Sequence, residues 1–166
     1  MDSARIRRFD PSDAAWLVAR HGTLDAREAG FDASFAPVVA GILDGFIASG
    51  APAVEAGWIA ETQSRRLGSI VCMREGAETA RLRLFLLEPG ARGQGVGCRL
   101  LQICMGFARA RGYRGMILST HESHRAACAL YARTGWRPRA RCAPTAAIWS
   151  NKAGNSPVVR LAFGGR

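Results

Sequence analysis

The sequence lacks any apolar run that approaches the roughly 18 residues of a membrane-spanning helix. Its first residues, Met1 to Arg5, also lack the basic-then-apolar layout of a secretory signal peptide. The five cysteines are odd in number and include no Cys-x-x-Cys pair, so the sequence predicts neither a disulfide framework nor a zinc site. We therefore expect a cytoplasmic protein without a metal ion or a membrane partner.

Lysine and aromatic residues are scarce. Lys152 is the single lysine among 23 basic residues, which outnumber 13 acidic residues and give a net charge of +10. Such a balance is typical of proteins that bind nucleic acid, lipid headgroups or small anions. Nucleic-acid binding favours basic residues clustered with exposed aromatics, whereas here the arginines are scattered and aromatics make up 8%. We expect no nucleic-acid partner. The densest run, Arg133 to Arg141, fits either a solvated basic face or steering of a phosphorylated ligand.

The length and the hydrophobic pattern predict one domain over residues 1–166. A chain of this size buries about 70% of the surface that its unfolded form exposes, which suffices for one core. The patterns predict four helices: one after the Asp10-Pro11 start, one near Phe35 to Phe46, one near Val96 to Ala108 and one from Ser123 to Thr134, with Gly22 and Gly30 interrupting the segment after the first. Seven strands are expected at Ala4–Phe9, Val54–Glu61, Leu67–Arg74, Ala80–Leu87, Gly115–Ser119, Trp136–Cys142 and Val158–Phe163.

The most informative stretch is Arg92-Gly93-Gln94-Gly95-Val96-Gly97, which lies between a predicted strand and a predicted helix. Its glycines allow the backbone to approach a ligand closely, and the free N–H groups at a helix start favour a phosphate. A nucleotide P-loop would require Lys and Ser or Thr after the last glycine, where Cys98-Arg99 stand. A dinucleotide fingerprint would require a glycine at Leu100. The turn therefore predicts a phosphate site of another kind.

Two blocks resemble the GCN5-related N-acetyltransferase (GNAT) family. The Arg-x-x-Gly-x-Gly turn from Arg92 to Gly97 is similar to the family's pyrophosphate loop, and Phe85 to Pro89 is similar to the strand and proline before it. Residues 126 to 136, Ala-Ala-Cys-Ala-Leu-Tyr-Ala-Arg-Thr-Gly-Trp, resemble the family's A-x-x-L-Y-x-x-x-G-F block, with Trp136 in place of Phe. The resemblance implies an α/β (α+β) fold with a mixed, mostly antiparallel sheet of about seven strands and about four helices.

The resemblance further implies transfer of an acetyl group from acetyl-CoA to a primary amine of a small molecule or a protein. The strand backbone before the loop would pair with the pantetheine arm, and the Leu87 N–H would donate to the thioester carbonyl. The loop N–H groups and the Arg92 side chain would hold the pyrophosphate. The cofactor-binding residues implied in this way are Phe85, Leu86, Leu87, Arg92, Gly93, Gln94, Gly95, Val96, Gly97, Cys98, His124 and Tyr131.

Tyr131 and Leu87 are the candidate catalytic residues. The phenol of Tyr131 is the expected general acid toward the departing thiolate. The general base is an open question, because the strand positions where the family often has Glu carry Arg81, Arg83 and Ser119, and because His124 replaces a frequent Asn. The nearest strand acids are Glu78 and Glu88. His121, Glu122 or His124, acting directly or through water, is the alternative to a matching carboxylate.

Acceptor specificity is carried in the family by the loop between the first two helices and by the late strands, here about His21 to Asp32 and Ala143 to Pro157. Asp25, Glu28 and Asp32 in the first of these suggest attraction of a cationic amine. Residues His21 to Phe31 also resemble the acetyltransferase part of bacterial MarR–GNAT fusion proteins. Family members often dimerise through the late strands, so the resemblance also allows a homodimer. A non-catalytic acyl-CoA sensor is the alternative function.

Overall fold

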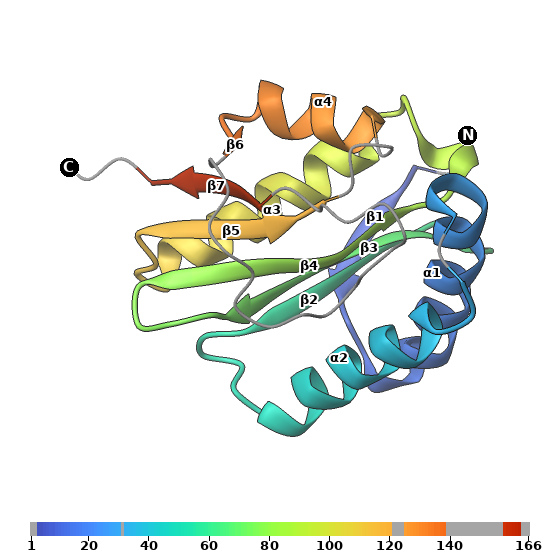
Figure 1. Cartoon of the computed structure of the whole chain (residues 1–166), viewed down its shortest axis with the longest axis horizontal. Helices are drawn as coiled ribbons and strands as arrows, with labels where there is room; N and C mark the ends of the chain where they lie inside the picture. Colours follow the sequence, from blue (N-terminus) through green and yellow to red (C-terminus); the bar gives the residue numbers. More distant parts are fainter. Residues whose placement is uncertain (1–2, 31, 121–124, 139–157, 164–166) are drawn as a thin grey trace.

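The computed structural model describes residues 3–30, 32–120, 125–138 and 158–163, which fold into one sheet with helices on both faces (Figure 1). The strands are β1 (Arg5–Arg8), β2 (Ala56–Glu61), β3 (Arg66–Arg74), β4 (Thr79–Leu87), β5 (Gly115–Ser119), β6 (Arg137–Pro138) and β7 (Val158–Ala162). The helices are α1 (Ala14–Ala29), α2 (Phe35–Ser49), α3 (Val96–Ala110) and α4 (Arg125–Arg133), with short 3-10 turns at Pro11–Asp13 and Pro89–Ala91.

The sheet is mixed and mostly antiparallel, as predicted. Within the described residues the strands lie in the order β1-β2-β3-β4-β5-β7-β6, and β4 and β5 form the parallel pair. We expected about seven strands, whereas the body of the sheet consists of five, β1 to β5. The late strands extend one edge, and of the predicted strand from Trp136 to Cys142 the structure describes β6, Arg137–Pro138. Residues 139–142 of that span lie outside the described residues.

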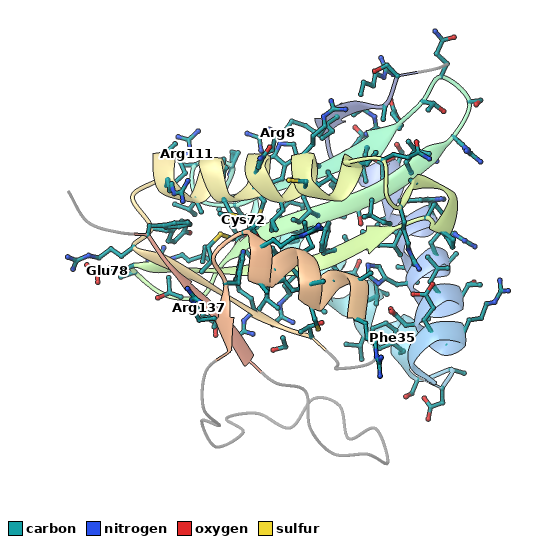
Figure 2. All side chains as sticks on the ribbon, turned by 90° about the horizontal axis from the view of Figure 1, so that it is seen from above. Arg8, Phe35, Cys72, Glu78, Arg111 and Arg137 are labelled. Atoms are coloured by element: carbon teal, nitrogen blue, oxygen red, sulfur yellow. The ribbon has the colours of Figure 1, made fainter. Side chains whose placement is uncertain are left out.

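Two clusters of apolar side chains cover the two faces of the sheet. The larger cluster contains Cys72 and Leu82 with the inner face of α3, and Figure 2 shows Cys72 beneath that helix. The smaller cluster contains Val71 with residues of α1 and α2. Cys72 and Val71 are consecutive residues of one strand, so their side chains point to opposite faces. Helices α1 and α2 therefore cover the face opposite α3.

Helix α1 is longer than predicted. Gly22 was expected to interrupt this segment, but α1 continues through it to Ala29 and ends at Gly30, whose φ is 68°. A Cβ at Gly22 would lie 3.4 Å from the Cβ of Ala36, so this glycine lets α2 approach α1 closely instead of ending the helix. The loop between the two helices is consequently limited to residues 30–34, rather than extending from His21 to Asp32 as expected.

None of the helices in the described part of the chain combines the length and the apolar character that crossing a bilayer requires.

Candidate active site

Strand β4 contains a bulge at Leu84. The φ angle of Leu84 is 52°, in the left-handed region that a leucine rarely adopts. The carbonyl oxygen of Leu84 accepts a hydrogen bond of 2.8 Å from the buried Oγ of Ser69 on β3. The register between the strands shifts at the same place, because Ser69 lies opposite Leu86 whereas Val71 lies opposite Arg83. One extra residue is therefore inserted into β4.

The bulge reverses the alternation of side chains along β4. Before it, Ala80 and Leu82 face α3, and beyond it Phe85 and Leu87 pack against the same α3 cluster. Leu84 instead belongs to the cluster under α1 and α2. Without the extra residue, Leu84 rather than Phe85 would face α3, because side chains alternate with a period of two. The bulge thus brings Phe85 and Leu87 to the α3 side, near the glycine-rich turn.

Strands β4 and β5 separate after three residue pairs. Thr79 to Arg81 pair with Gly115 to Ile117, and no later β4 residue pairs with β5. Strand β5 pairs with β7 on its other side as far as Ser119. In the described residues, β4 beyond Arg81 is therefore bonded to β3 alone. We call the β5-facing side of residues 82–87 the open edge. Apart from the Leu87 carbonyl, which accepts a hydrogen bond from Arg92, its backbone groups are not paired with β5 and suit an extended ligand.

The backbone of Leu87 faces the open edge. The neighbouring Glu88 N–H donates to the Leu67 carbonyl of β3 over 2.8 Å, and a Cβ on Gly68 of β3 would lie 2.5 Å from the Leu86 oxygen. The backbone N–H and C=O groups of Leu86 and Glu88 thus point toward β3. Those of Phe85 and Leu87, which alternate with them, point away from β3. Leu86, expected among the cofactor contacts, presents its backbone to β3.

The glycine-rich turn has the conformation that the sequence predicts. Gly93 and Gly95 have φ angles of 75° and 77°, which side chains other than glycine rarely adopt. Gly97 is required for a different reason, because a Cβ there would lie 2.6 Å from Leu87 Cδ1 at the end of β4. Gln94 holds the turn closed through a hydrogen bond of 2.6 Å from its Nε2 to the Gly90 carbonyl.

Helix α3 begins directly at this turn. Gly95 is its N-cap and provides no side-chain acceptor, and the Arg99 N–H donates to the Gly95 carbonyl over 3.1 Å. The N–H groups of the first turn, those of Val96, Gly97 and Cys98, have no acceptor within the helix, as at any helix start. These donors and the positive end of the helix dipole favour an anion such as a phosphate.

The Arg92 side chain is tied to helix α1. Its Nη2 lies 2.7 and 3.0 Å from the two carboxylate oxygens of Glu28 and donates to the Leu87 carbonyl over 3.1 Å. A second ion pair lies beside it, where Arg20 Nη2 donates to Glu88 Oε2 over 2.7 Å. Both pairs connect α1 to the end of β4. Arg92 was expected to contact phosphate directly, whereas here its guanidinium fixes the turn against α1.

Tyr131 lies under the open edge. It is 5% exposed, and its ring centroid is 6.0 Å from that of Phe85 on β4 and 5.7 Å from that of Trp136. Leu130 of the same helix lies 3.4 Å from the position a Cβ on Gly97 would take. Burial raises the pKa of Tyr131 above its usual value of 10, and the nearby Cys128 and Cys104 add to the rise. The phenol therefore keeps its proton at neutral pH.

No strand carboxylate is available as a general base at the positions considered from sequence. Glu88 pairs with Arg20, and Glu78 lies at the far end of β4, 3.4 Å from Arg114. Ser119 ends β5 and lies 3.5 Å from an Arg81 nitrogen. The other candidates, His121, Glu122 and His124, lie outside the described residues.

The three acids suggested for attracting a cationic amine already have partners within the fold. Asp25 lies 3.0 Å from the Nδ1 of His21, Glu28 pairs with Arg92, and Asp32 accepts hydrogen bonds from the Ser34 backbone and hydroxyl. The expectation that they form a cation-attracting loop is therefore weakened, because two of them belong to helix α1 and each carboxylate is neutralised or bonded locally.

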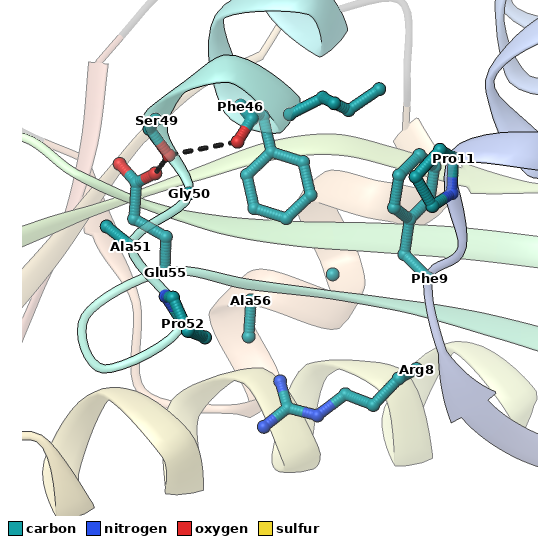
Figure 3. A pocket seen from close by; sticks show the side chains of 12 residues that line it. Arg8, Phe9, Pro11, Phe46, Ser49, Gly50, Ala51, Pro52, Glu55 and Ala56 are labelled. Carbon is teal, nitrogen blue, oxygen red and sulfur yellow. Dashed lines mark hydrogen bonds between the residues drawn. The ribbon is translucent and has the colours of Figure 1, made fainter.

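A hollow at the opposite edge of the sheet is a poor alternative site. It has a volume of about 360 Å³ and lies between β1, β2 and the end of α2, as Figure 3 shows. The carboxylate of Glu55, which lines the hollow, accepts one hydrogen bond at each oxygen, from Ser49 Oγ and from the Arg74 N–H. Arg8 stacks on Trp58 and Phe107. The polar groups of this hollow therefore serve the fold.

Comparison with known proteins identifies the family. The acetyltransferase (GNAT) family model matches residues 27–136, about two thirds of the chain, so the protein belongs to this family. No curated protein matches. The finer resemblance to MarR–GNAT fusion proteins is not shown by any of these comparisons and stays a prediction.

Solved structures with low identity share the fold over nearly the whole chain. A GNAT acetyltransferase from Staphylococcus aureus has a TM-score of 0.79 at 18% identity, over 96% of this chain and 99% of its own. PaiA N-acetyltransferase from Thermoplasma acidophilum, solved with coenzyme A, has a TM-score of 0.74 at 17% identity, over 97% and 99%. YncA from Salmonella typhimurium, solved with its cofactor acetyl-CoA, has a TM-score of 0.71 at 16% identity, over 99% and 96%.

Proposed function

We propose that the protein is an acetyl-CoA-dependent N-acetyltransferase that acts on a primary amine. The observation that carries the proposal is the continuity between the open edge of β4 and the start of α3. The first offers free backbone groups to an extended chain, and the second offers N–H groups to phosphates. Acetyl-CoA combines these two parts, a pantetheine arm and a pyrophosphate. Membership in the GNAT family and the two coenzyme-bound structures of similar fold support the assignment.

The residues present fit this cofactor. The N–H groups between Gly93 and Cys98 would hold the pyrophosphate, and the backbone of Phe85 and Leu87 would hold the pantetheine arm. Arg92 would act by fixing the turn through Glu28. When bound, the cofactor supplies an acetyl group activated as a thioester. His124, whose placement is not described, keeps its assignment from the family resemblance alone.

The chain contributes a hydrogen-bond donor and a proton to the reaction. The N–H of Leu87 faces the open edge and would stabilise negative charge that develops on a carbonyl oxygen there. Tyr131 lies against Phe85 at the same edge and retains its proton, as a general acid requires. The amine proton would leave through His121, Glu122, His124 or ordered water, because the acids Glu78 and Glu88 are paired with arginines.

The test is amine-stimulated release of the CoA thiol from acetyl-CoA, measured with a thiol reagent on the purified protein. An acetyltransferase releases the thiol in proportion to the amine supplied and yields the acetylated amine, detectable by mass spectrometry. Tight binding of acetyl-CoA without stimulated release by any amine in a broad panel would favour the acyl-CoA sensor instead.

A further inference from the structure

Two arginines lie on the α1/α2 face of β4, directly beside the open edge. Arg83 is the register partner of Val71, and Arg81 is the partner of Met73. Val71 and Met73 both belong to the apolar cluster under α1 and α2. Because partners in adjacent strands point to the same face, Arg81 and Arg83 face the side opposite α3. They stand where β4 and β5 separate, since Arg81 is the last β4 residue that pairs with β5.

The two arginines differ in their partners. Glu75 binds Arg81 with both oxygens, each at 2.6 Å from a guanidinium nitrogen. No carboxylate of the described residues lies within ion-pair distance of Arg83. Arg83 is nevertheless partly buried. Its charge is therefore partly withdrawn from water, and the Glu75 carboxylate, which binds Arg81, acts on it only from beyond ion-pair distance.

A cation in this position favours a negative ligand. Burial lowers the pKa of Arg83, and the like charge of Arg81 lowers it further, which together outweigh the opposing effect of the Glu75 carboxylate. A partly buried charge without a direct ion pair costs free energy, which a bound anion would recover through charge-assisted hydrogen bonds. The guanidinium fork suits the two oxygens of a carboxylate or a phosphate.

The late part of the chain is strongly basic. No Asp or Glu occurs after Glu122, whereas eight basic residues do: Arg125, Arg133, Arg137, Arg139, Arg141, Lys152, Arg160 and Arg166. The register of the sheet aligns backbone positions Arg81, Ile117, Arg160 and Arg137 in one row across β4, β5, β7 and β6. Arg137, labelled in Figure 2, is exposed at the end of that row.

We propose that Arg83, with Arg81 beside it, binds an anionic group of the acceptor, so that the substrate is a small amine carrying a carboxylate or a phosphate. The proposal rests on the proposed acetyltransferase function. Arg83 precedes Phe85 by two residues, with the bulged Leu84 between them. An amine at the open edge near Phe85 and an anionic group a few bonds away would span this separation.

The experiment compares matched acceptors with and without an anionic group. The first pairs are free amino acids and their amides, and a second pair is phosphoethanolamine and ethanolamine, which distinguishes the two kinds of anion. The values of kcat/KM are measured for wild type, Arg83→Gln, Arg83→Lys and the control Arg114→Gln, whose arginine is 77% exposed at the far end of β4. Acetyl-CoA affinity is measured for each protein by calorimetry.

We expect wild type to prefer the anionic member of at least one pair by tenfold or more. Arg83→Gln should reduce this ratio to near one with unchanged acetyl-CoA affinity, whereas Arg83→Lys and Arg114→Gln should retain a preference. Equal use of both members by wild type, or an unchanged ratio in Arg83→Gln, overturns the proposal. So does weaker acetyl-CoA binding in Arg83→Gln, because it would assign the arginine to the cofactor.

A binding measurement covers the case in which no acceptor of the panel turns over. The N-acetylated amino acids, N-acetylphosphoethanolamine and their uncharged counterparts are titrated into protein saturated with CoA. Tighter binding of a charged member, lost in Arg83→Gln, supports the proposal, and equal or absent binding overturns it. Failure of wild type to bind acetyl-CoA at all would instead refute the acetyltransferase assignment.

Discussion

The hydroxyl of Ser69 donates a 2.8 Å hydrogen bond to the carbonyl of Leu84, the residue whose φ of 52° forms the bulge in β4. The bond is buried and joins the two strands at the place where their register shifts. It provides a partner for a carbonyl that the bulge removes from the regular ladder. The side chain of Ser69 thus supports the conformation that places Phe85 and Leu87 beside the glycine-rich turn.

Replacing Ser69 by alanine should therefore affect stability and cofactor binding together. The Leu84 carbonyl would lose its partner, which we expect to lower the free energy of unfolding by about 1–3 kcal/mol. Chemical denaturation followed by circular dichroism measures this change, and calorimetry should show weaker acetyl-CoA binding. Ser64→Ala, in the exposed β2–β3 turn, is the control. Equal stability of Ser69→Ala and Ser64→Ala would contradict a supporting role for the bond.

The glycine-rich turn makes a prediction about charge and backbone conformation. Gly95→Asp places a side chain at φ 77° and a negative charge beside the first turn of α3. We expect acetyl-CoA binding to be lost beyond detection by calorimetry. The matched control is Gly106→Ala within α3, where a Cβ has free space and helix propensity predicts a gain of up to about 1 kcal/mol. Unchanged cofactor affinity in Gly95→Asp would mean that the phosphates bind elsewhere.

Tyr131→Phe separates proton donation from binding. The ring contacts with Phe85 and Trp136 are retained, so we expect acetyl-CoA affinity within about twofold of wild type. From the usual size of acid catalysis, we expect kcat to be lowered roughly 100-fold. Because burial raises the pKa of Tyr131, its ionisation should not reduce wild-type kcat between pH 8 and 10. Equal kcat values for the two proteins would remove Tyr131 from the acid role.

From the turn at Pro11–Asp13, we predict that the folded protein loses stability in acid. Burial by itself would raise the pKa of Asp13, but hydrogen bonds from Arg7, the Asp10 N–H and Arg66 outweigh it and lower the pKa to about 2. Because the folded-state pKa lies below the unfolded value near 4, this contribution is complete above pH 4 and is lost as the pH falls toward 2.

Asp13→Ala should remove that pH dependence and lower the free energy of unfolding at pH 7 by about 1–3 kcal/mol, because Arg66 loses its acceptor and Arg7 keeps only Glu61. Denaturation curves at pH 3 and pH 7 measure both effects, with Asp44→Ala on the exposed face of α2 as control. If wild type loses less stability between pH 7 and pH 3 than Asp13→Ala does, the pKa of Asp13 is not lowered in the folded protein.

The elements that the sequence predicted well are those with strong local signals. Alternation placed β3 and β4 within one residue of their observed starts, and the glycine-rich turn predicted a helix directly after it, where α3 begins at Val96. Gly50, with a φ of 53°, ends α2, as the sequence Gly50-Ala51-Pro52 indicates. Gly22 misled the prediction, because a glycine that permits close helix packing has the same local appearance as one that ends a helix.

The features that sequence reasoning missed depend on contacts between distant residues. Ser69 and Leu84 were not identified, although the four consecutive apolar residues from Leu84 to Leu87 break the preceding alternation and are a weak signal for a bulge. The Arg92–Glu28 pair joins residues 64 positions apart, so no local pattern predicts it. Likewise, the face of the sheet on which Arg81 and Arg83 lie became apparent only from the register of β4 against β3.

The most direct test of this account is calorimetric titration of acetyl-CoA into the purified protein, with ATP and desulfo-CoA as comparison ligands. We predict one site per chain with micromolar affinity for acetyl-CoA, similar affinity for desulfo-CoA and no binding of ATP, because the open edge of β4 binds the pantetheine arm that ATP lacks. No binding of acetyl-CoA, or equal binding of ATP, would contradict the assignment of the open edge and the glycine-rich turn to this cofactor.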